Sequence, residues 1–252
     1  MSSFRWTRAP WGDVLECEAL SPLARHVFTA RGLDVPHPGD GAGWTPLAAY
    51  MEVDEADVWR MRQVHGVTVH TDIPSSCDGT WADGDLLATD RSDVALAVRT
   101  ADCVPILYAD ARTGAVAAVH AGWRGSAAAA ASHMVSVMAG RFGTRAADLM
   151  VAIGPSIGPE TYEVGQEVVD AFTASQPLDS ARGTWWRASA RDGRYLLDLW
   201  TVTRDQLAAA GVRPDRIHLA GLCTATHADV FESYRVNCAA AGRMAAAIRR
   251  TR

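Results

Sequence analysis

Residues 99–125, RTADCVPILYADARTGAVAAVHAGWRG, decide the fold of this chain. The segment holds two apolar runs with β character, 104–108 and 115–119, which are joined by a short polar turn. Two such runs around a turn predict a hairpin or two neighbouring strands. If the runs pair antiparallel, the start of the first lies beside the end of the second. We therefore expect Cys103, which opens the first run, to lie close to His120, which closes the second.

A thiol and an imidazole at one sheet edge suit two kinds of chemistry. They can form part of a metal site, or they can act as a nucleophile and its base. The alternative is a buried cysteine beside a histidine whose hydrogen bonds are satisfied in the core. The flanking residues favour a functional site, because Asp102, Trp123, Arg124 and two glycines are more polar and richer in turns than a core strand end requires.

The composition indicates one large domain or two small ones, since 48% of the 252 residues are hydrophobic and can form a substantial core. A net charge of −5 gives no electrostatic footprint for nucleic acid. Five cysteines without a C-x-x-C motif argue against a disulfide framework and a zinc ribbon. The N-terminal residues lack the apolar core of a signal peptide, and no later stretch is long and apolar enough to span a bilayer. The sequence therefore predicts a cytoplasmic protein that binds neither membranes nor nucleic acid.

The sequence contains no lysine. This absence excludes Schiff-base chemistry on lysine and a lysine general base. It also excludes a Walker A phosphate loop, which requires lysine. Any phosphate must therefore be held by arginine, by backbone N–H groups or by a metal.

The rest of the chain mixes strands and helices without the regular spacing of β-α-β units. Residues 126–140 predict a helix with Ser126 as its N-cap and Gly140 as its stop. Residues 198–210 predict an amphipathic helix, and residues 230–236 predict a strand or a loop. This mixture favours an α/β (α+β) fold, in which helices pack on a mixed β-sheet.

A third candidate ligand lies upstream of the hairpin. His65 precedes a glycine inside a strand-like run, and a glycine there marks a bulge or a close approach to the backbone. With Cys103 and His120 it gives three nitrogen and sulfur donors. Three protein ligands leave a fourth position open on Zn²⁺, which is typical of a catalytic site. Spacing alone does not decide between this metal site and a Cys103 nucleophile with His120 as its base.

Three acidic residues lie near these candidates in the sequence, namely Asp83, Asp85 and Asp102. A carboxylate of this group can orient a ligating imidazole, or it can move protons during a reaction. The alternative for Asp83 and Asp85 is an ordinary turn or cap carboxylate.

Arginines and aromatic residues beside turns are candidates for binding a substrate. Arg124, Arg235 and Arg243 lie in or beside turns that contain glycine and can bind an anionic oxygen, although a solvated surface position is the alternative. Trp123 and Tyr162 can stack on a base, or they can belong to the core.

Six segments of the chain resemble a known family. They are RQVHG (62–66), ADGDLLAT (82–89), RTADCVPILYAD (99–110), AVHAGWRG (118–125), AIGPSIGPETYEVG (152–165) and FESYRVNCAAAGR (231–243). In this order they are similar to the YfiH family, also called the DUF152 or laccase-domain family. The resemblance implies one domain over residues 1–252, with a mixed sheet core similar to that of the deamidating toxins. It also implies a single Zn²⁺ held by His65, Cys103 and His120.

The resemblance further implies an activity on purine nucleosides. Members are described as phosphorolysing adenosine, inosine and methylthioadenosine to the free base and ribose 1-phosphate, and as deaminating adenosine. We therefore expect a purine nucleoside and phosphate as substrates of a monomer or homodimer. Asp83 is the hypothesised acid that protonates the leaving purine. Asp102, Arg124, Tyr162 and Arg235 are expected to bind the substrate.

The family's laccase label raises copper as the alternative metal. A laccase needs several copper ions and many histidine ligands, which eight histidines in total do not supply. The sequence therefore favours one Zn²⁺ per chain over copper.

The chain departs from the family pattern at several positions. The loop after Arg31 is shortened, which leaves the preferred nucleoside open. Ser156 and Thr161 stand where the family has cysteines, which are not among the implied ligands. Val236 replaces the second arginine of a pair, so Arg235 alone matches.

Two other functions remain open from the sequence. One is a Cys-His amide hydrolase or deamidase, for instance one that edits peptidoglycan precursors. The other is a metal-holding partner protein without enzymatic activity, for instance in cell division. Stoichiometric zinc on Cys103 argues against the first, and turnover of a nucleoside argues against the second.

Overall fold

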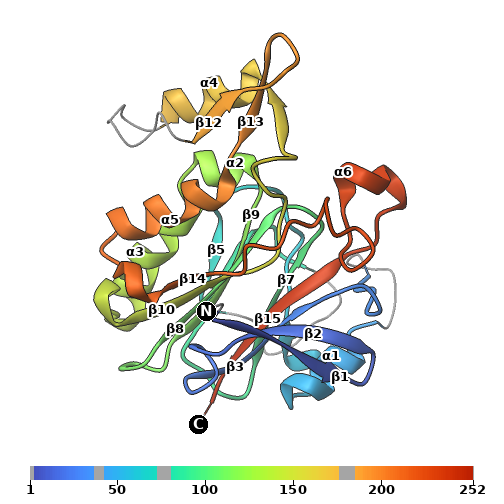
Figure 1. Cartoon of the computed structure of the whole chain (residues 1–252). Helices are drawn as coiled ribbons and strands as arrows, with labels where there is room; N and C mark the ends of the chain where they lie inside the picture. The colour runs from blue at the N-terminus through green and yellow to red at the C-terminus, as the bar shows by residue number, and fades with distance from the viewer. Residues whose placement is uncertain (1–2, 37–42, 73–80, 176–184, 252) are drawn as a thin grey trace.

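The structure, a computed structural model, describes residues 3–36, 43–72, 81–175 and 185–251. Two six-stranded sheets form its centre, and a smaller sheet lies beside them (Figure 1). The first sheet contains, in spatial order, β1 (Phe4–Ala9), β2 (Gly12–Cys17), β3 (Ala24–Thr29), β15 (Met244–Arg250), β7 (Ala95–Thr100) and β4 (Val58–Trp59). The second contains β14 (Ile217–Leu219), β10 (Leu149–Ile153), β8 (Val104–Asp110), β9 (Val116–Ala121), β6 (Leu86–Thr89) and β5 (Val69–His70). The third contains β11 (Glu163–Gly165), β13 (Arg194–Leu197) and β12 (Trp186–Ala188).

Both large sheets are mixed, which confirms the predicted mixed α/β class, although the sequence predicts one such sheet and the structure has two. In the first, β4 runs parallel to β7 while the other neighbours are antiparallel. In the second, β5 with β6 and β10 with β14 are parallel pairs. The described helices are α1 (Thr45–Met51), α2 (Trp123–Ala127), α3 (Ala130–Phe142), α4 (Gln166–Ser175), α5 (Leu199–Ala209) and α6 (Tyr234–Asn237). No helix in these parts of the chain has the length and apolar character needed to cross a membrane.

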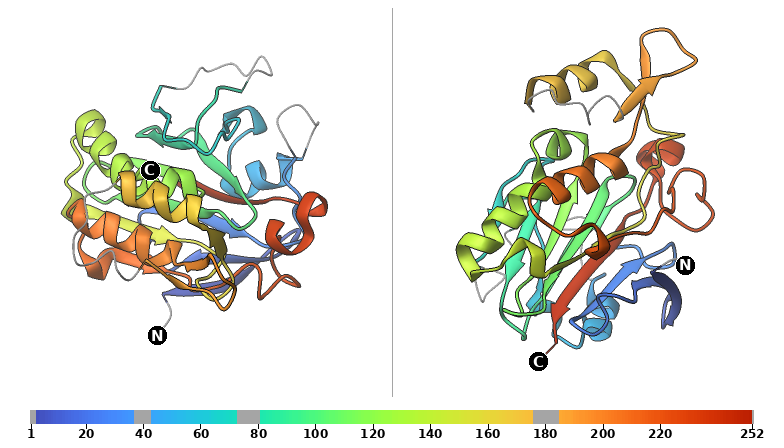
Figure 2. Two further views of the ribbon diagram at one scale, coloured as in Figure 1. Left: turned by 90° about the horizontal axis from the view of Figure 1, so that it is seen from above. Right: turned by 60° about the vertical axis from the view of Figure 1, so that its left-hand side comes forward.

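The two large sheets pack face to face between outer layers of helix. Alternate residues of a strand point to opposite faces, so each strand contributes to two cores. Leu107 of β8 meets Leu96 of β7 in the core between the sheets. Ile106 of β8 points the other way, into the core under α3 and α5. Helix α1 covers the far face of the first sheet, where Met51 packs (Figures 1 and 2).

The predicted hairpin is confirmed as β8 and β9. The two strands pair antiparallel, and their register places Val104 opposite Ala121 and Pro105 opposite His120. Cys103 immediately precedes β8, so the hairpin brings its backbone to the end of β9 that carries His120. This register is the structural basis of the candidate site.

The predicted helix over residues 126–140 is wrong at both ends. The chain forms two helices, α2 and α3, because Ala129 adopts a left-handed conformation with φ of 60° between them. Ser126 is no cap, since its backbone N–H donates to the carbonyl of Gly122 within α2. Helix α3 continues past Gly140 and ends where Gly143 takes a φ of 68°. A left-handed glycine is the usual helix terminator, and Gly140 does not take that conformation.

Two other predicted segments can be compared directly. The amphipathic helix over residues 198–210 is confirmed as α5, and its first turn is capped by Asp198, which accepts a hydrogen bond from the N–H of Thr201 at 2.9 Å. The strand or loop over residues 230–236 is wrong in its last part, where α6 begins at Tyr234. The apolar side chains Tyr234 and Val236 are exposed there, so their alternation does not reflect a strand with one buried face.

Candidate active site

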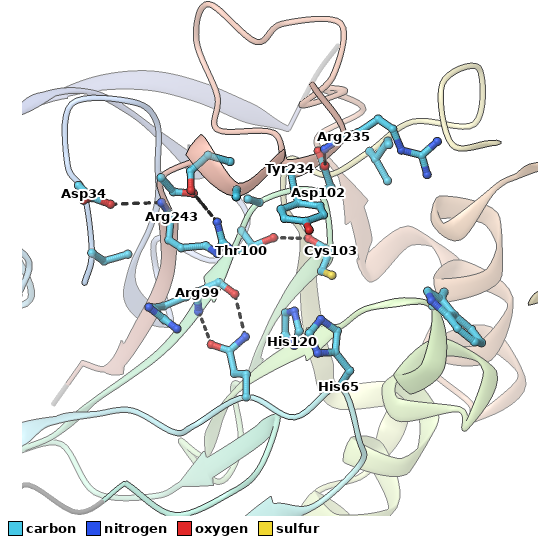
Figure 3. Close-up of a pocket in the computed structure, with 18 of the residues that line it drawn as sticks. Asp34, His65, Arg99, Thr100, Asp102, Cys103, His120, Tyr234, Arg235 and Arg243 are labelled. Carbon is cyan, nitrogen blue, oxygen red and sulfur yellow. Dashed lines mark hydrogen bonds between the residues drawn. The ribbon is translucent and has the colours of Figure 1, made fainter. Parts of the chain in front are cut away.

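His65, Cys103 and His120 converge at one edge of the second sheet (Figure 3). One nitrogen of each imidazole and the Cys103 sulfur all lie within 4.8 Å of one another. The two imidazole rings meet edge to face, with centroids 5.0 Å apart. Among the described residues this is the group of three or more His, Cys, Asp and Glu ligand atoms that is close enough to hold a metal ion. Three segments far apart in sequence therefore build one cluster.

Asp85 holds the two histidines of the cluster in place. Its carboxylate is fully buried and accepts a hydrogen bond from His120 Nδ1 at 2.8 Å. This bond keeps a proton on Nδ1, so Nε2 is the nitrogen that can bind a metal once it has lost its own proton. The same carboxylate accepts the N–H groups of His65 at 3.0 Å and Gly66 at 2.7 Å. These bonds hold His65 in a left-handed conformation with φ of 62°, which few residues other than glycine adopt.

Gly122 makes room for the cluster. A side chain at this position would place a Cβ atom 2.8 Å from His65 Cδ2 and 3.1 Å from Cys103 Sγ. The first distance is shorter than real Cβ contacts, so only glycine fits without displacing His65. Gly122, two residues after His120, therefore allows His65 and Cys103 to lie close to the backbone at this position.

The charges of the cluster favour a thiolate beside a protonated imidazole in the metal-free protein. Burial alone would raise the pKa of Cys103, but the charge of His120 and hydrogen bonds from both histidines lower that pKa to about 6. Burial alone would lower the pKa of His120, but the charge of Cys103 and the hydrogen bond to Asp85 raise it. A thiolate is the form of cysteine that binds metals.

The donor set fits a soft divalent metal. Two imidazole nitrogens and one thiolate are ligands that Zn²⁺ prefers, and three protein ligands leave one position for water or substrate. Asp85 provides the outer carboxylate that metal-binding histidines usually have. The residues present could therefore hold a metal ion and leave one position on it open.

The lowered pKa of Cys103 predicts a test by alkylation. In metal-free protein, modification of the Cys103 peptide by iodoacetamide should rise as the pH passes through about 6 and then level off, because the thiolate is the reactive form. Peptide mass spectrometry measures the rate at Cys103 separately from the other cysteines. Added zinc should suppress the reaction at this residue. A rate that instead rises near the ordinary thiol pKa of 9.0 would contradict the proposed charge state.

The cluster opens into a cavity of about 1000 Å³. Of the predicted substrate-binding residues, Asp102, Tyr162 and Arg235 line this cavity. Arg235 places its guanidinium carbon 5.3 Å from the centre of the Tyr162 ring and donates a hydrogen bond to the carbonyl of Glu163 at 2.9 Å. The structure thus brings these three residues and the His65–Cys103–His120 cluster to one cavity.

Asp102 uses both carboxylate oxygens within the protein. One oxygen accepts the Thr224 hydroxyl at 2.5 Å, and the other accepts the N–H of Arg235 at 2.6 Å. The side chain is buried, and its backbone has a φ of 88°. Asp102 therefore connects the Cys103 turn to the first turn of α6.

Two predicted residues do not line the cavity. Asp83 pairs its exposed carboxylate with Arg62. Arg124 is exposed and lies over the Trp123 ring, with its guanidinium carbon 4.1 Å from the ring centre. The structure does not bring either side chain to the cluster.

The structure gives three residues a place in the cluster or the cavity wall that the sequence does not assign to them. Asp85 was one of three acids of undecided role, and Arg243 was one of three arginines able to bind an anion. Gln63 is not among the residues that the sequence indicates, and its side chain exchanges two hydrogen bonds of 2.8 Å with the backbone of Arg99 in the cavity wall. Gln63 lies within the RQVHG segment (62–66), two residues before His65, and this position is the sequence signal that could have indicated it.

The fold and the site define a mixed α/β protein with a cluster able to bind a soft metal at the edge of a large cavity. A family model described as "Multi-copper polyphenol oxidoreductase laccase" matches residues 43–251. The chain belongs to this family, which confirms the resemblance to YfiH and DUF152 proteins.

Named relatives and solved structures agree with this assignment. The chain is 39% identical over 196 residues to "Purine nucleoside phosphorylase YlmD" of Geobacillus stearothermophilus, covering 75% of this chain and 70% of the relative. It is 39% identical over 203 residues to a "Purine nucleoside phosphorylase" of Deinococcus radiodurans, covering 80% and 74%. The crystal structure of YlmD from G. stearothermophilus superposes with a TM-score of 0.86 at 31% identity, over 100% of both chains. That of Bacillus licheniformis hypothetical protein YfiH superposes with a TM-score of 0.87 at 27% identity, also over 100% of both chains.

Proposed function

We propose that this protein is a purine nucleoside phosphorylase whose reaction takes place beside a Zn²⁺ ion held by His65, Cys103 and His120. The observation that carries the proposal is the opening of this cluster into a large cavity lined by arginine and aromatic side chains. The names of the relatives from G. stearothermophilus and D. radiodurans support the same reaction.

Phosphorolysis places defined demands on the residues of the cavity. An oxygen of phosphate forms a bond to C1′ of the ribose while the C1′–N9 bond breaks, and the purine leaves with a proton. Phosphate is anionic and the ribose becomes oxocarbenium-like, so the site must hold two opposite charges close together. When bound, Zn²⁺ supplies Lewis-acid chemistry and lowers the pKa of a coordinated water. The latter is the basis for proposing adenosine deamination as a second activity.

The chain's own residues supply binding and orientation. Asp85 fixes the orientation of His120, and its bonds to the His65 backbone keep the third ligand in place. The Tyr162 ring, which Arg235 partly covers, offers an aromatic surface for a purine base. We propose adenosine, inosine and methylthioadenosine as substrates, and a monomer or homodimer in the cytoplasm as the working form.

Zinc is the proposed metal in preference to copper. The cluster holds one thiolate and two imidazoles, which suit a single zinc ion with an open position. The family description names a multicopper oxidase, but that chemistry requires several copper ions with many histidine ligands. Elemental analysis of the purified protein distinguishes the two metals.

The role of Asp83 as the acid that protonates the purine stays a prediction. Its carboxylate is exposed and forms an ion pair with Arg62, and Asp83 does not line the cavity. The Asp83→Asn variant tests the role, because removal of a general acid should lower turnover by about 10²–10⁴-fold. Turnover equal to that of the wild type would exclude Asp83 and leave the proton to another group or to water.

The proposed function is tested by incubating zinc-loaded protein with adenosine, with and without phosphate. We expect adenine and ribose 1-phosphate only when phosphate is present. Inosine formed without phosphate would show the deaminase activity. No product from a protein with a full complement of zinc would contradict the proposal, and would favour amide hydrolysis or a metal-holding role without turnover.

A further inference from the structure

Arg243 is a half-buried cation in the cavity wall. It forms no ion pair within 4.0 Å with an acidic side chain among the residues that the structure describes. Its backbone N–H donates a hydrogen bond to the Asp34 carboxylate at 3.2 Å. A partly buried charge without a counter-ion is costly, and an anionic ligand can remove that cost.

The Arg243 guanidinium is held by its own loop. Nη1 donates to the carbonyls of Ala241 at 2.8 Å and Gly242 at 2.9 Å. These two bonds use Nη1, and within the part of the chain that the structure describes Nε and Nη2 have no hydrogen-bond acceptor and so remain available as donors. Figure 3 shows the Arg243 side chain near Thr100 among the residues that line the cavity, and its guanidinium carbon lies 6.0 Å from the centre of the Tyr234 ring. A guanidinium fixed in this way can bind an oxyanion through two N–H groups.

The sheet fixes Arg243 relative to the metal cluster. Arg243 directly precedes β15, whose first residue, Met244, pairs with Thr100 of β7. The Thr100 hydroxyl in turn donates to the carbonyl of Cys103. The backbone of Arg243 is thus connected to Cys103 through the pairing of β15 with β7 and one hydrogen bond. We therefore expect the distance between Arg243 and Cys103 to vary little.

The other two candidate arginines have less suitable surroundings. Arg235 is exposed and engages Tyr162 and the carbonyl of Glu163. Arg124 lies over Trp123 and does not line the cavity. Both acids of the cavity wall are also engaged: Asp102 binds Thr224 and the Arg235 N–H, and Asp34 accepts the Arg243 N–H.

We propose that Arg243 forms the subsite that binds a phosphate group in this cavity. The group is either inorganic phosphate, the co-substrate of the proposed function on which this assignment rests, or the phosphate of a nucleotide. The chain has no lysine, so the recognition of phosphate must use arginine, backbone N–H groups or the metal.

The test measures binding and turnover separately on protein whose zinc content has been matched. Isothermal titration calorimetry gives the affinity for inorganic phosphate and for adenosine 5′-monophosphate, and steady-state assays give the KM for phosphate and for adenosine. The variants are Arg243→Gln, Arg243→Met and Arg243→Lys. Arg204→Gln is the control, because Arg204 is an exposed arginine of α5 that does not line the cavity. Thermal unfolding identifies any variant that does not fold.

We expect Arg243→Gln and Arg243→Met to weaken phosphate binding and to raise the KM for phosphate by at least about tenfold, which is the loss of one charge-assisted contact. Arg243→Lys should recover part of the affinity, because it restores the charge without the planar fork. The KM for adenosine should change by less than about twofold, and Arg204→Gln should match the wild type.

The outcomes distinguish this proposal from the proposed function. Phosphate binding that depends on Arg243 in a protein that cleaves no nucleoside would support the subsite and contradict phosphorolysis. Phosphorolysis with a phosphate KM and a nucleotide affinity that are both unchanged in all three variants would overturn the subsite, and so would a phosphate KM that is raised by Arg235→Gln instead. Loss of affinity for the nucleotide alone would support the subsite and identify the nucleotide as the source of the phosphate.

Discussion

Replacing Cys103 with alanine is expected to remove the metal from the cluster and to lower nucleoside turnover by at least about a hundredfold. Cys103 supplies the one thiolate of the donor set, and its sulfur lies within 4.8 Å of both imidazole ligand atoms. Without it, two neutral imidazoles remain, which bind zinc far more weakly than a three-ligand site. Loss of a residue that only hydrogen-bonds to a ligand lowers metal affinity or activity by about 10–100-fold. Loss of a ligand itself should therefore lower activity by at least about a hundredfold.

The experiment combines elemental analysis, turnover of adenosine with phosphate, and thermal unfolding of the same preparations. Cys238→Ala is the matched control, because Cys238 is an exposed thiol that does not line the cavity. We expect the control to keep its zinc and its turnover. A folded Cys103→Ala variant with wild-type turnover would show that the reaction does not use this cluster.

The second large effect is expected for Asp85→Asn. The Asp85 carboxylate accepts hydrogen bonds from His120 Nδ1 and from the backbone of His65 and Gly66. An amide has one acceptor oxygen, and its NH₂ group would face donors that the carboxylate now satisfies. We expect zinc affinity to fall about 10–100-fold. The free energy of unfolding should fall by about 1–3 kcal/mol, because buried donors lose their partner.

Asp83→Asn is the control for folding and zinc binding, since it makes the same chemical change two residues away. Asp83 is exposed and pairs with Arg62 at the surface, where ion pairs contribute little to stability. Competition with a zinc chelator measures the affinity, and chemical denaturation measures the stability. Equal zinc affinities in the two variants would show that Asp85 does not position the ligands.

The sequence predicts the hairpin and its chemistry because strand alternation and turn composition are local signals. The register of β8 and β9 then brings Cys103 and His120 together without further information. His65 is different, since it joins the cluster only through its left-handed backbone and the bonds to Asp85. The glycine that follows His65 makes it a candidate ligand from the sequence, but the choice of a metal site over a Cys103 nucleophile rests on the family resemblance.

Other features could not be read from local patterns. Helices α2 and α3 are separated within a run of alanines, whose side chains carry no signal for the break at Ala129. Asp83 and Asp85 flank a glycine, and nothing in that short segment indicates which carboxylate is buried. The position of Arg243 depends on the pairing of β15 with β7, which joins residues far apart in the chain.

The most direct test of the central claim is a zinc titration of metal-free protein. Bound zinc and phosphate-dependent release of adenine from adenosine are measured at each step. We predict that adenine release rises in proportion to bound zinc and levels off at about one zinc per chain, as expected for a single three-ligand site. Full activity in metal-free protein, or complete zinc binding without release of adenine, would contradict the assignment of this cluster as the active site of a purine nucleoside phosphorylase.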